Sequence, residues 1–303
     1  MFDLHVHAAP DVTPRRADDH DVVAAYARAG FTGCVLKAHY ESTVGRAAAA
    51  SRAHHPLRVH GGIALNQHTG GVNPAAVAAC LGAGGRVVWM PTADAHTQRD
   101  AGLPSLCGAR TDLSRHAYAV PPVATGTETG PYDGRDAGPD DGPDAGPYDR
   151  PGIAEDVRAV CRMVAEADAV LATGHLSTPE VRWLLETARG LGVRRLLLTH
   201  PGYTVPAMPA AEAAELAGRG ALAEITTFQL LHQPGMTAAR LAAYAARVGL
   251  DRVVLSSDAG QPDSPSPPEA LELLVGTLAR EGLDRGALRA CASELPEALV
   301  TPR

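Results

Sequence analysis

The chain begins with MFDLHVH (residues 1–7), in which polar and apolar residues alternate. Successive side chains of a β-strand point to opposite faces, so this alternation predicts Asp3, His5 and His7 on one face and the apolar residues between them on the other. Two imidazoles two positions apart on a strand can reach one metal ion. The alternative is two unrelated histidines at a frayed terminus. Further histidines and acids that follow other predicted strands favour the metal site.

The alternation of a strand and a helix repeats along the chain. Seven further short apolar stretches are predicted as strands, namely Gly33–Lys37, Val59–Leu65, Arg86–Met90, Ala169–Thr173, Arg194–Thr199, Ala221–Ile225 and Arg252–Ser256. Two of the intervening helices have clear starts: Asn73 precedes Pro74 as an N-cap, and Ser177 has the capping-box spacing to Glu180. Eight such units predict an α/β fold, a (β/α)8 TIM-type barrel, with residues 1–303 as a single domain.

The alternation of strand and helix is interrupted after the fourth predicted strand. Residues from about 92 to 152 contain no clear element, and within them about 126–152 repeat Gly, Pro and Asp, as in GPDDGPDAGPYDRPG. Such a composition buries too little apolar surface to offset the entropy lost on ordering. We expect a disordered, low-complexity insertion on one loop, either solvated and without function or acting as a lid, with the first favoured.

Composition narrows the classes of partner. The net charge of −7 and the absence of a basic stretch argue against a nucleic-acid partner. No apolar run is long enough to span a membrane, and no signal peptide is recognisable, so we expect a cytoplasmic protein. The five cysteines are dispersed, which indicates neither a disulfide framework nor a structural zinc site. A small-molecule substrate is the expected partner, and homo-oligomerisation stays open.

Polar side chains gather where the predicted strands end. In a barrel of parallel strands all carboxyl ends lie at one face, so residues distant in sequence converge there. The strand-end residues are His5, His7, Lys37, His39, Asn66, Thr92, His175, His200, Glu224 and Asp258. Several of these side chains can bind a metal, which predicts a metal site at this face.

Lysine occurs once in the chain, at position 37, whereas 26 of the 27 basic residues are arginine. A lysine differs from an arginine because it can lose its proton when buried and then act as a nucleophile or accept a carboxyl group. Chance retention is the alternative. We interpret Lys37 as a functional residue at the end of the second strand.

The stretches DLHVHAAPD, VLKAH, GGIALN, VWMPT, TGHLS and LTHPG carry a family resemblance. A His-x-His pair on the first strand, histidines after the fifth and sixth strands and an aspartate after the eighth form the pattern of the amidohydrolase superfamily of metal-dependent hydrolases. The chain resembles this superfamily, and more closely a bacterial family of amidohydrolase-like proteins, outside residues 93–152.

The resemblance implies that His5, His7, His175 and Asp258 form the shell of one metal, and that His200 either completes a second site or polarises the substrate. It also makes Asp258 the general base. The chemistry agrees, because a divalent cation lowers the pKa of bound water to about 7 and a carboxylate beside it can accept the proton. Imidazole ligands favour zinc or a similar transition metal over magnesium or calcium. We expect one ion, with two as the alternative.

The fourth strand departs from the superfamily pattern, because its end, WMPT (residues 89–92), offers neither a lysine nor a glutamate as a bridging ligand. Either the site is mononuclear, or Lys37 takes over as a bridge or as an anion clamp, and a clamp is preferred. The residues expected to bind substrate with it are Arg15, Arg16, His39, Asn66 and Glu224. Such a set predicts an anionic substrate.

The predicted function is metal-dependent hydrolysis of a small anionic molecule at a C–N bond, such as an amide, a cyclic amide or an amidine. Three alternatives remain: a metal-dependent decarboxylase or other lyase, a phosphoester or lactone hydrolase, and a catalytically silent barrel that binds a small molecule. Release of carbon dioxide without consumption of water would identify the decarboxylase. A silent binding protein should lack a tightly bound metal.

Overall fold

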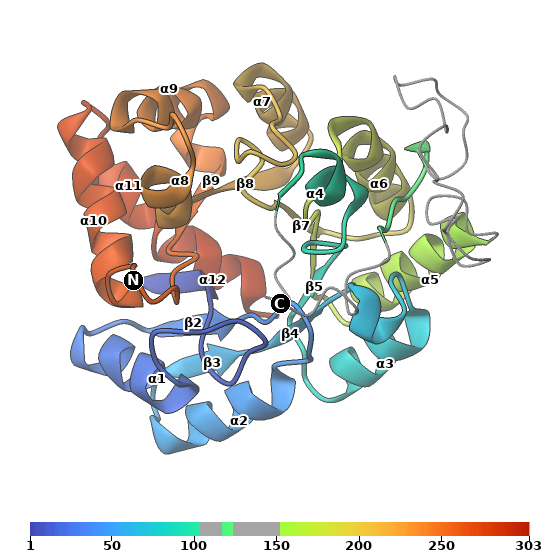
Figure 1. Cartoon of the computed structure of the whole chain (residues 1–303), viewed down its shortest axis with the longest axis horizontal. Coiled ribbons are helices and arrows are strands. Elements are labelled where there is room, and N and C mark those ends of the chain that lie inside the picture. Colours follow the sequence, from blue (N-terminus) through green and yellow to red (C-terminus); the bar gives the residue numbers. More distant parts are fainter. Residues whose placement is uncertain (104–116, 124–151, 303) are drawn as a thin grey trace.

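Parallel β-strands form the centre of the fold and follow one another in sequence order (Figure 1). The computed structural model describes residues 1–103, 117–123 and 152–302. The strands are β1 (Phe2–Val6), β2 (Gly33–Leu36), β3 (Arg58–His60), β4 (Gly62–Ala64), β5 (Val87–Trp89), β6 (Val170–Ala172), β7 (Arg195–Leu198), β8 (Ala221–Thr226) and β9 (Val253–Ser256). Apart from Gly152, the predicted insertion at 126–152 lies outside the described residues.

The predicted third strand is divided at Gly61 into β3 and β4. The cause is Thr43, which follows β2: its N–H donates to the carbonyl of Gly62 at 3.0 Å, and its hydroxyl accepts from the N–H of Gly62 at 3.0 Å. A side chain at position 61 would meet the backbone of Thr43, since a Cβ there would lie 2.7 Å from its carbonyl carbon. β3 therefore pairs with β2 and β4 with β5, and together they fill the third position of the barrel.

The first and last strands meet at their carboxyl ends. The N–H of Asp258 donates to the carbonyl of His5, and the N–H of His7 donates to the carbonyl of Ala259, both at 2.8 Å. Val6 and Ala259 form an isolated parallel bridge. The predicted (β/α)8 barrel is confirmed.

The strand β1 departs from regular alternation because its register shifts between Asp3 and Val6. Leu4 packs in the interior of the barrel, whereas Val6 belongs to the layer between strands and helices. Asp3 accepts hydrogen bonds from the hydroxyl of Tyr26 at 2.5 Å and from the N–H of Ser257 at 3.0 Å. The prediction that Asp3 shares the face of the two histidines was therefore wrong.

Helices surround the strands (Figure 1). They are α1 (Asp19–Arg28), α2 (Val44–Ala53), α3 (Pro74–Gly82), α4 (His96–Asp100), α5 (Ile153–Glu166), α6 (Thr178–Gly190), α7 (Ala210–Gly218), α8 (Thr227–His232), α9 (Ala238–Val248), α10 (Pro267–Arg280), α11 (Arg285–Cys291) and α12 (Glu294–Val300). The capping box between Ser177 and Glu180 is confirmed, as is the cap of α3, where the side chain of Asn73 accepts from the N–H of Ala75. The short helix α4 lies where no element was predicted.

The amino-terminal end of the barrel is closed by α12. Leu299 and Val300 pack against the interior residues of the strands, among them Trp89. Arg195 on β7 donates to the carbonyl of Leu299 at 2.8 Å, and Arg86 donates to that of Val300 at 2.9 Å. With this end filled, a cavity can form at the carboxyl ends of the strands.

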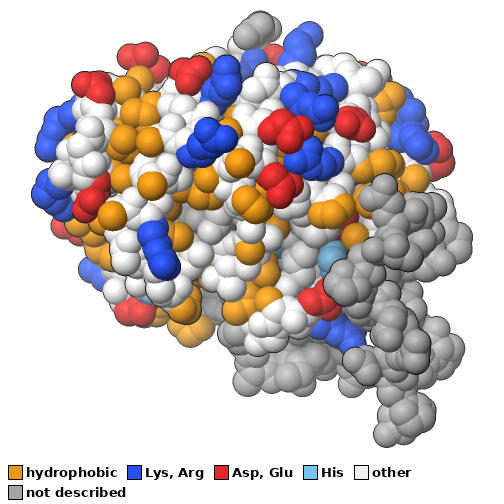
Figure 2. All heavy atoms as spheres, turned by 90° about the horizontal axis from the view of Figure 1, so that it is seen from above, with side chains coloured by type: hydrophobic (Ala, Val, Ile, Leu, Met, Phe, Trp, Pro, Cys, Tyr) orange, Lys and Arg blue, Asp and Glu red, His pale blue; other side chains and the backbone are white. Residues whose placement is uncertain are grey.

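The surface carries charges of both signs. Figure 2 shows acidic and basic side chains intermingled over one face. Among the described side chains, ion pairs such as Arg182 with Glu215 at 2.8 Å join neighbouring helices. No helix within the described residues is both long and apolar enough to cross a membrane.

Candidate metal centre

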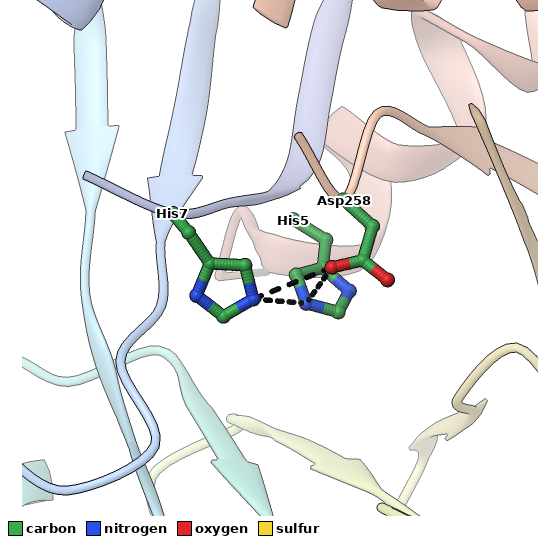
Figure 3. Close-up of side chains that lie close together, drawn as sticks. All are labelled: His5, His7 and Asp258. Carbon is green, nitrogen blue, oxygen red and sulfur yellow. Dashed lines mark hydrogen bonds and ion pairs between the residues drawn. The ribbon is translucent and has the colours of Figure 1, made fainter. Parts of the chain in front are cut away.

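Three ligand-type side chains converge at the junction of β1 and β9 (Figure 3). Nε2 of His5 lies 3.1 Å from Oδ1 of Asp258 and 3.3 Å from Nε2 of His7, and Nε2 of His7 lies 3.3 Å from the same carboxylate oxygen. His5 and His7 come from β1 and the residue that follows it, whereas Asp258 follows β9 in a left-handed backbone conformation, with a φ of 49°. All three side chains are buried.

The three atoms fit a divalent transition metal. Ligands bonded to a tetrahedral zinc ion at 2.0 to 2.1 Å lie about 3.3 Å from one another, and the three atoms here lie 3.1 to 3.3 Å apart. Two imidazole nitrogens and one carboxylate oxygen are also the donor set that such ions prefer. Among the described residues, this is the group of three whose atoms lie close enough to share an ion.

A carboxylate behind His5 orients that imidazole. Oε1 of Glu224 on β8 lies 3.1 Å from Nδ1 of His5 and accepts a hydrogen bond from the hydroxyl of Ser256 at 2.7 Å. Burial by itself raises the pKa of Glu224, but the charges of His5 and His200 and the hydrogen bonds from His5 and Ser256 lower it to about 2. Glu224 is therefore ionised and holds the proton of His5 on Nδ1, which leaves Nε2 free to bind a metal.

Lys37 lies directly beside this group. Its Nζ is 3.0 Å from Nε2 of His5 and 5.5 Å from the ring centroid of Trp89, and only 2% of the residue is exposed. Burial lowers the pKa of Lys37 to about 8, partly opposed by the charges of Asp258 and Glu224. The amine is therefore mostly charged at neutral pH but can lose its proton readily.

A cavity of about 220 Å³ lies at the carboxyl ends of the strands, next to the three ligand-type side chains. Its lining residues are His7, Thr13, Pro14, Arg15, Lys37, His39, Gln98, His175, His200, Tyr203, Phe228, Asp258 and Gln261. The structure thus brings residues from strands distant in sequence to one site, as the barrel topology predicts.

His175 and His200 line this cavity but are not members of the close group of three. Their ring centroids lie 5.0 Å apart. Nδ1 of His175 lies 3.1 Å from Oε1 of Gln98, so Gln98 accepts its proton and leaves Nε2 without one. Nδ1 of His200 is buried and has no hydrogen-bond partner among the described residues, and the φ of 23° at this residue is left-handed.

Burial lowers the pKa values of the cavity histidines. The pKa of His7 lies well below 6.5, with the charge of Arg15 as the next cause, and that of His39 is lowered well below 6.5 by burial and by Lys37. Burial also lowers the pKa of His200 to about 4. A histidine must be neutral to bind a metal, so these three histidines carry no net charge that would have to be lost first at neutral pH.

The residues predicted to bind substrate divide into two groups. Arg15 and His39 line the cavity; the guanidinium of Arg15 lies 3.2 Å from Nδ1 of His7, and the ring of His39 stacks on His7 with centroids 5.0 Å apart. Arg16, Asn66 and Glu224 are absent from the cavity wall.

These three side chains bond to other parts of the protein. Arg16 donates to the carbonyl of Ser264 at 2.9 Å. The amide of Asn66 donates to the carbonyl of His39 and to the hydroxyl of Thr92, each at 2.8 Å, and so joins the loops that follow β2, β4 and β5. Glu224 is committed to His5, as described above.

Several cavity residues were not predicted from the sequence. Gln98 lies on α4, in the segment without a recognisable pattern. Tyr203 follows His200 by three positions, and Phe228 follows the end of β8 by two, so their closeness to strand ends was an available signal. Thr13 and Gln261 lie on the loops that follow β1 and β9, and nothing in the sequence distinguishes them from other polar loop residues.

Structural comparison shows that this architecture occurs in known proteins. The fold is similar to that of an amidohydrolase from Pseudomonas aeruginosa, with a TM-score of 0.58 and 12% identity over 98% of this chain and 94% of that chain. It is also similar to an organophosphorus hydrolase from Deinococcus radiodurans, with a TM-score of 0.51 and 16% identity over 99% and 92% of the two chains. The chain therefore shares its barrel fold with these two proteins.

Comparison with sequences gives one family. No curated protein matches the chain in sequence. A family model that covers residues 1–224 does match, which is well over half of the chain. The chain belongs to the family of unknown function DUF6282.

Proposed function

We propose that the protein is a metal-dependent hydrolase that cleaves a C–N bond, in an amide, a cyclic amide or an amidine, of a small anionic molecule. One observation carries the proposal: Nε2 of His5, Nε2 of His7 and Oδ1 of Asp258 converge within 3.1 to 3.3 Å beside a cavity. The similarity in fold to solved hydrolases supports it.

His5, His7 and Asp258 would hold the metal, and His175, whose Nε2 carries no proton, would be available as a further ligand. Zinc is the preferred ion because imidazole nitrogens dominate this set. When bound, such an ion supplies Lewis acidity, lowers the pKa of water to about 7 and polarises a substrate oxygen.

Asp258 would act as the base. Its carboxylate lies against the cavity and can accept a proton from the attacking water at one oxygen, then return it to the leaving nitrogen. His200 stays neutral at pH 7 because its pKa is about 4. A neutral imidazole can hydrogen-bond the substrate carbonyl without adding a charge to the site.

The cavity favours a small anion. Lys37 and Arg15 contribute cationic groups to its wall, whereas Asp258 contributes a carboxylate. A volume of about 220 Å³ is below the 300 to 1,000 Å³ that is usual for larger ligands. A carboxylate or phosphate group near Arg15 and Lys37 would place the rest of the molecule towards Asp258.

A decarboxylase is the second candidate, because the same ligand set beside two cationic groups also suits binding of a carboxylate. The discriminating experiment uses protein freed of metal with a chelator and then reloaded with zinc. It is incubated with small anionic amides, cyclic amides, lactones, phosphoesters and carboxylic acids in water enriched in oxygen-18.

We expect turnover only in the reloaded protein, with oxygen-18 in the acid released from an amide. Release of carbon dioxide, with no oxygen-18 in the organic product, would show that the reaction is a decarboxylation and not a hydrolysis. If the reloaded protein turns over no substrate of any of these classes, the hydrolase proposal is wrong and a binding function is favoured.

A further inference from the structure

Arg15 is held against His7 inside the site. Its Nη2 lies 3.2 Å from Nδ1 of His7, and its Nε donates to Oδ2 of Asp11 at 2.7 Å. The Arg15 side chain is 6% exposed and that of Asp11 is 2% exposed, so the ion pair is buried. The guanidinium therefore has a defined position behind His7.

This contact fixes the tautomer of His7. A guanidinium has only donors, so the atom it contacts, Nδ1 of His7, must accept. A neutral imidazole carries one proton, which must then reside on Nε2. From Nε2 the proton faces Oδ1 of Asp258 at 3.3 Å. A nitrogen that carries a proton has no lone pair for a metal, so this arrangement of His7 cannot bind the ion.

His5 and His175, the other two histidines proposed as metal ligands, have the opposite arrangement. Nδ1 of His5 donates to Glu224 at 3.1 Å, and Nδ1 of His175 donates to Gln98 at 3.1 Å. Each therefore has an unprotonated Nε2, ready to bind a metal. Lys37 donates to Nε2 of His5. This contact also requires an unprotonated Nε2 on His5. His7 alone among these three must change.

We propose that metal loading moves the proton of His7 from Nε2 to Nδ1 and expels Arg15 from its contact with that ring. After the change, Nδ1 and Nη2 would both be donors, and two N–H groups at this separation repel each other. No net proton is gained or lost, since Nε2 releases one to solvent and Nδ1 takes one up. The guanidinium then turns to the cavity that it already lines, where it can bind an anionic substrate.

The proposal rests on the proposed metal-dependent function and adds a coupling between two sites. Arg15 weakens metal binding as long as its guanidinium contacts His7. Because such coupling is reciprocal, an anion that binds Arg15 away from His7 would also strengthen metal binding. The competing arrangement is an imidazolate, in which His7 loses its only proton and Arg15 stays to stabilise the negative ring. The two arrangements predict opposite effects of removing Arg15.

The first test measures zinc affinity by calorimetry with a competing chelator. Arg15→Met removes the donor and keeps a side chain of similar length. We expect zinc to bind about tenfold more tightly, the scale of one hydrogen bond to a charged group. Arg28→Met, the same change at an exposed position on α1, should leave the affinity unchanged. Equal or weaker binding by Arg15→Met would overturn the proposal.

A second variant excludes two trivial causes. Arg15→Met leaves Asp11 buried without its partner and changes the net charge, and either could alter metal binding. The paired change of Asp11→Asn with Arg15→Met leaves the net charge unchanged and no unpaired carboxylate. We expect it to bind zinc more tightly than the wild type as well. If only the single variant does so, the effect belongs to Asp11 or to charge, and the proposal fails.

The tautomer itself is measured on the wild type by nitrogen-15 NMR of the histidine rings, with His7→Gln to assign the signals. We expect His7 to carry its proton on Nε2 without metal and on Nδ1 with zinc. A proton on Nδ1 in the metal-free protein, or loss of both protons with zinc, would overturn the proposal. If the wild type binds no zinc, the proposed function fails, while the metal-free spectrum still tests the contact between Arg15 and His7.

Discussion

Glu224 on β8 lies 3.1 Å from Nδ1 of His5 on β1, and this contact directs the opposite nitrogen of the ring to Asp258. The two residues are 219 positions apart, and the closure of the barrel brings them together. Glu224 is ionised, with a pKa of about 2, and buried, so it provides a fixed acceptor for the proton of His5. The candidate metal centre therefore depends on a residue that does not line the cavity.

Glu224→Gln should weaken zinc binding by about 10- to 100-fold, the usual effect of removing a carboxylate behind a ligating histidine. The amide can still accept from Nδ1, but it makes the imidazole a weaker ligand. Zinc affinity measured by chelator competition tests this expectation. Glu186→Gln, a change at an exposed residue of α6, serves as the control. An unchanged affinity in Glu224→Gln would show that the contact does not support the site.

Asp258→Asn should reduce kcat by about 100-fold or more, the scale for loss of a general base. The amide keeps one ligand oxygen, so metal analysis should still find the ion. The measurement is steady-state kinetics with a substrate found in the screen, alongside metal content. Full activity of Asp258→Asn with the ion retained would show that Asp258 is not the base.

Metal-free protein should become less stable as the pH falls from 6.5 towards 4. The pKa values of His7, His39, His175 and His200 lie below 6.5 in the folded chain, chiefly because of burial. In this interval the unfolded chain therefore binds more protons than the folded chain does. The free energy of unfolding consequently decreases as the pH decreases. Asp3 and His96 act in the opposite direction, because their pKa values are raised in the folded chain. They are outnumbered, because the pKa values of His60 and His68 are also lowered, to about 4.

Urea unfolding of the metal-free protein at pH 7, 6 and 5 measures this effect. We expect a loss of about 1 kcal/mol or more per pH unit, since one group can contribute up to about 1.4 kcal/mol per unit. A free energy of unfolding that stays constant or rises between pH 7 and pH 5 would contradict the assigned neutral histidines.

Lys37→Met should raise KM for the anionic substrate more than it lowers kcat. The change removes the charge, and its similar length allows the buried site to stay filled. Metal analysis distinguishes the two roles considered for this lysine. One ion per chain before and after the change supports an anion clamp, whereas a fall from two ions to one shows that Lys37 is carboxylated and bridges two metals.

Much of the fold was predictable because it depends on local patterns. The alternation of strand and helix, the caps at Asn73 and Ser177, and the rule that parallel strands end at one face together predicted the barrel and the convergence of His5, His7 and Asp258. The aspartate is 251 positions from the second histidine, yet topology alone joins them. Hydrogen bonds and burial then determine which strand-end residues face the cavity.

The remaining features arise from tertiary contacts without a sequence signal. Thr43 divides the third strand by bonding to Gly62, and the register shift in β1 directs Asp3 to Tyr26. Gln98 lies on a helix of five residues, too short to show a period, and reaches His175 across 77 positions. The side-chain amide of Asn66 donates hydrogen bonds to the carbonyl of His39 and to the hydroxyl of Thr92. The position of Asn66 at a strand end does not predict these contacts.

We expect the protein to bind a divalent transition metal through His5 and His7. The most direct test of this binding is the metal content of zinc-reloaded, gel-filtered protein, determined by mass spectrometry for the wild type and for the double change of His5→Ala with His7→Ala. We expect about one ion per chain in the wild type and none in the double variant, with circular dichroism showing that both are folded. A folded double variant that retains one ion per chain, or a wild type that retains none, would contradict metal binding by His5 and His7.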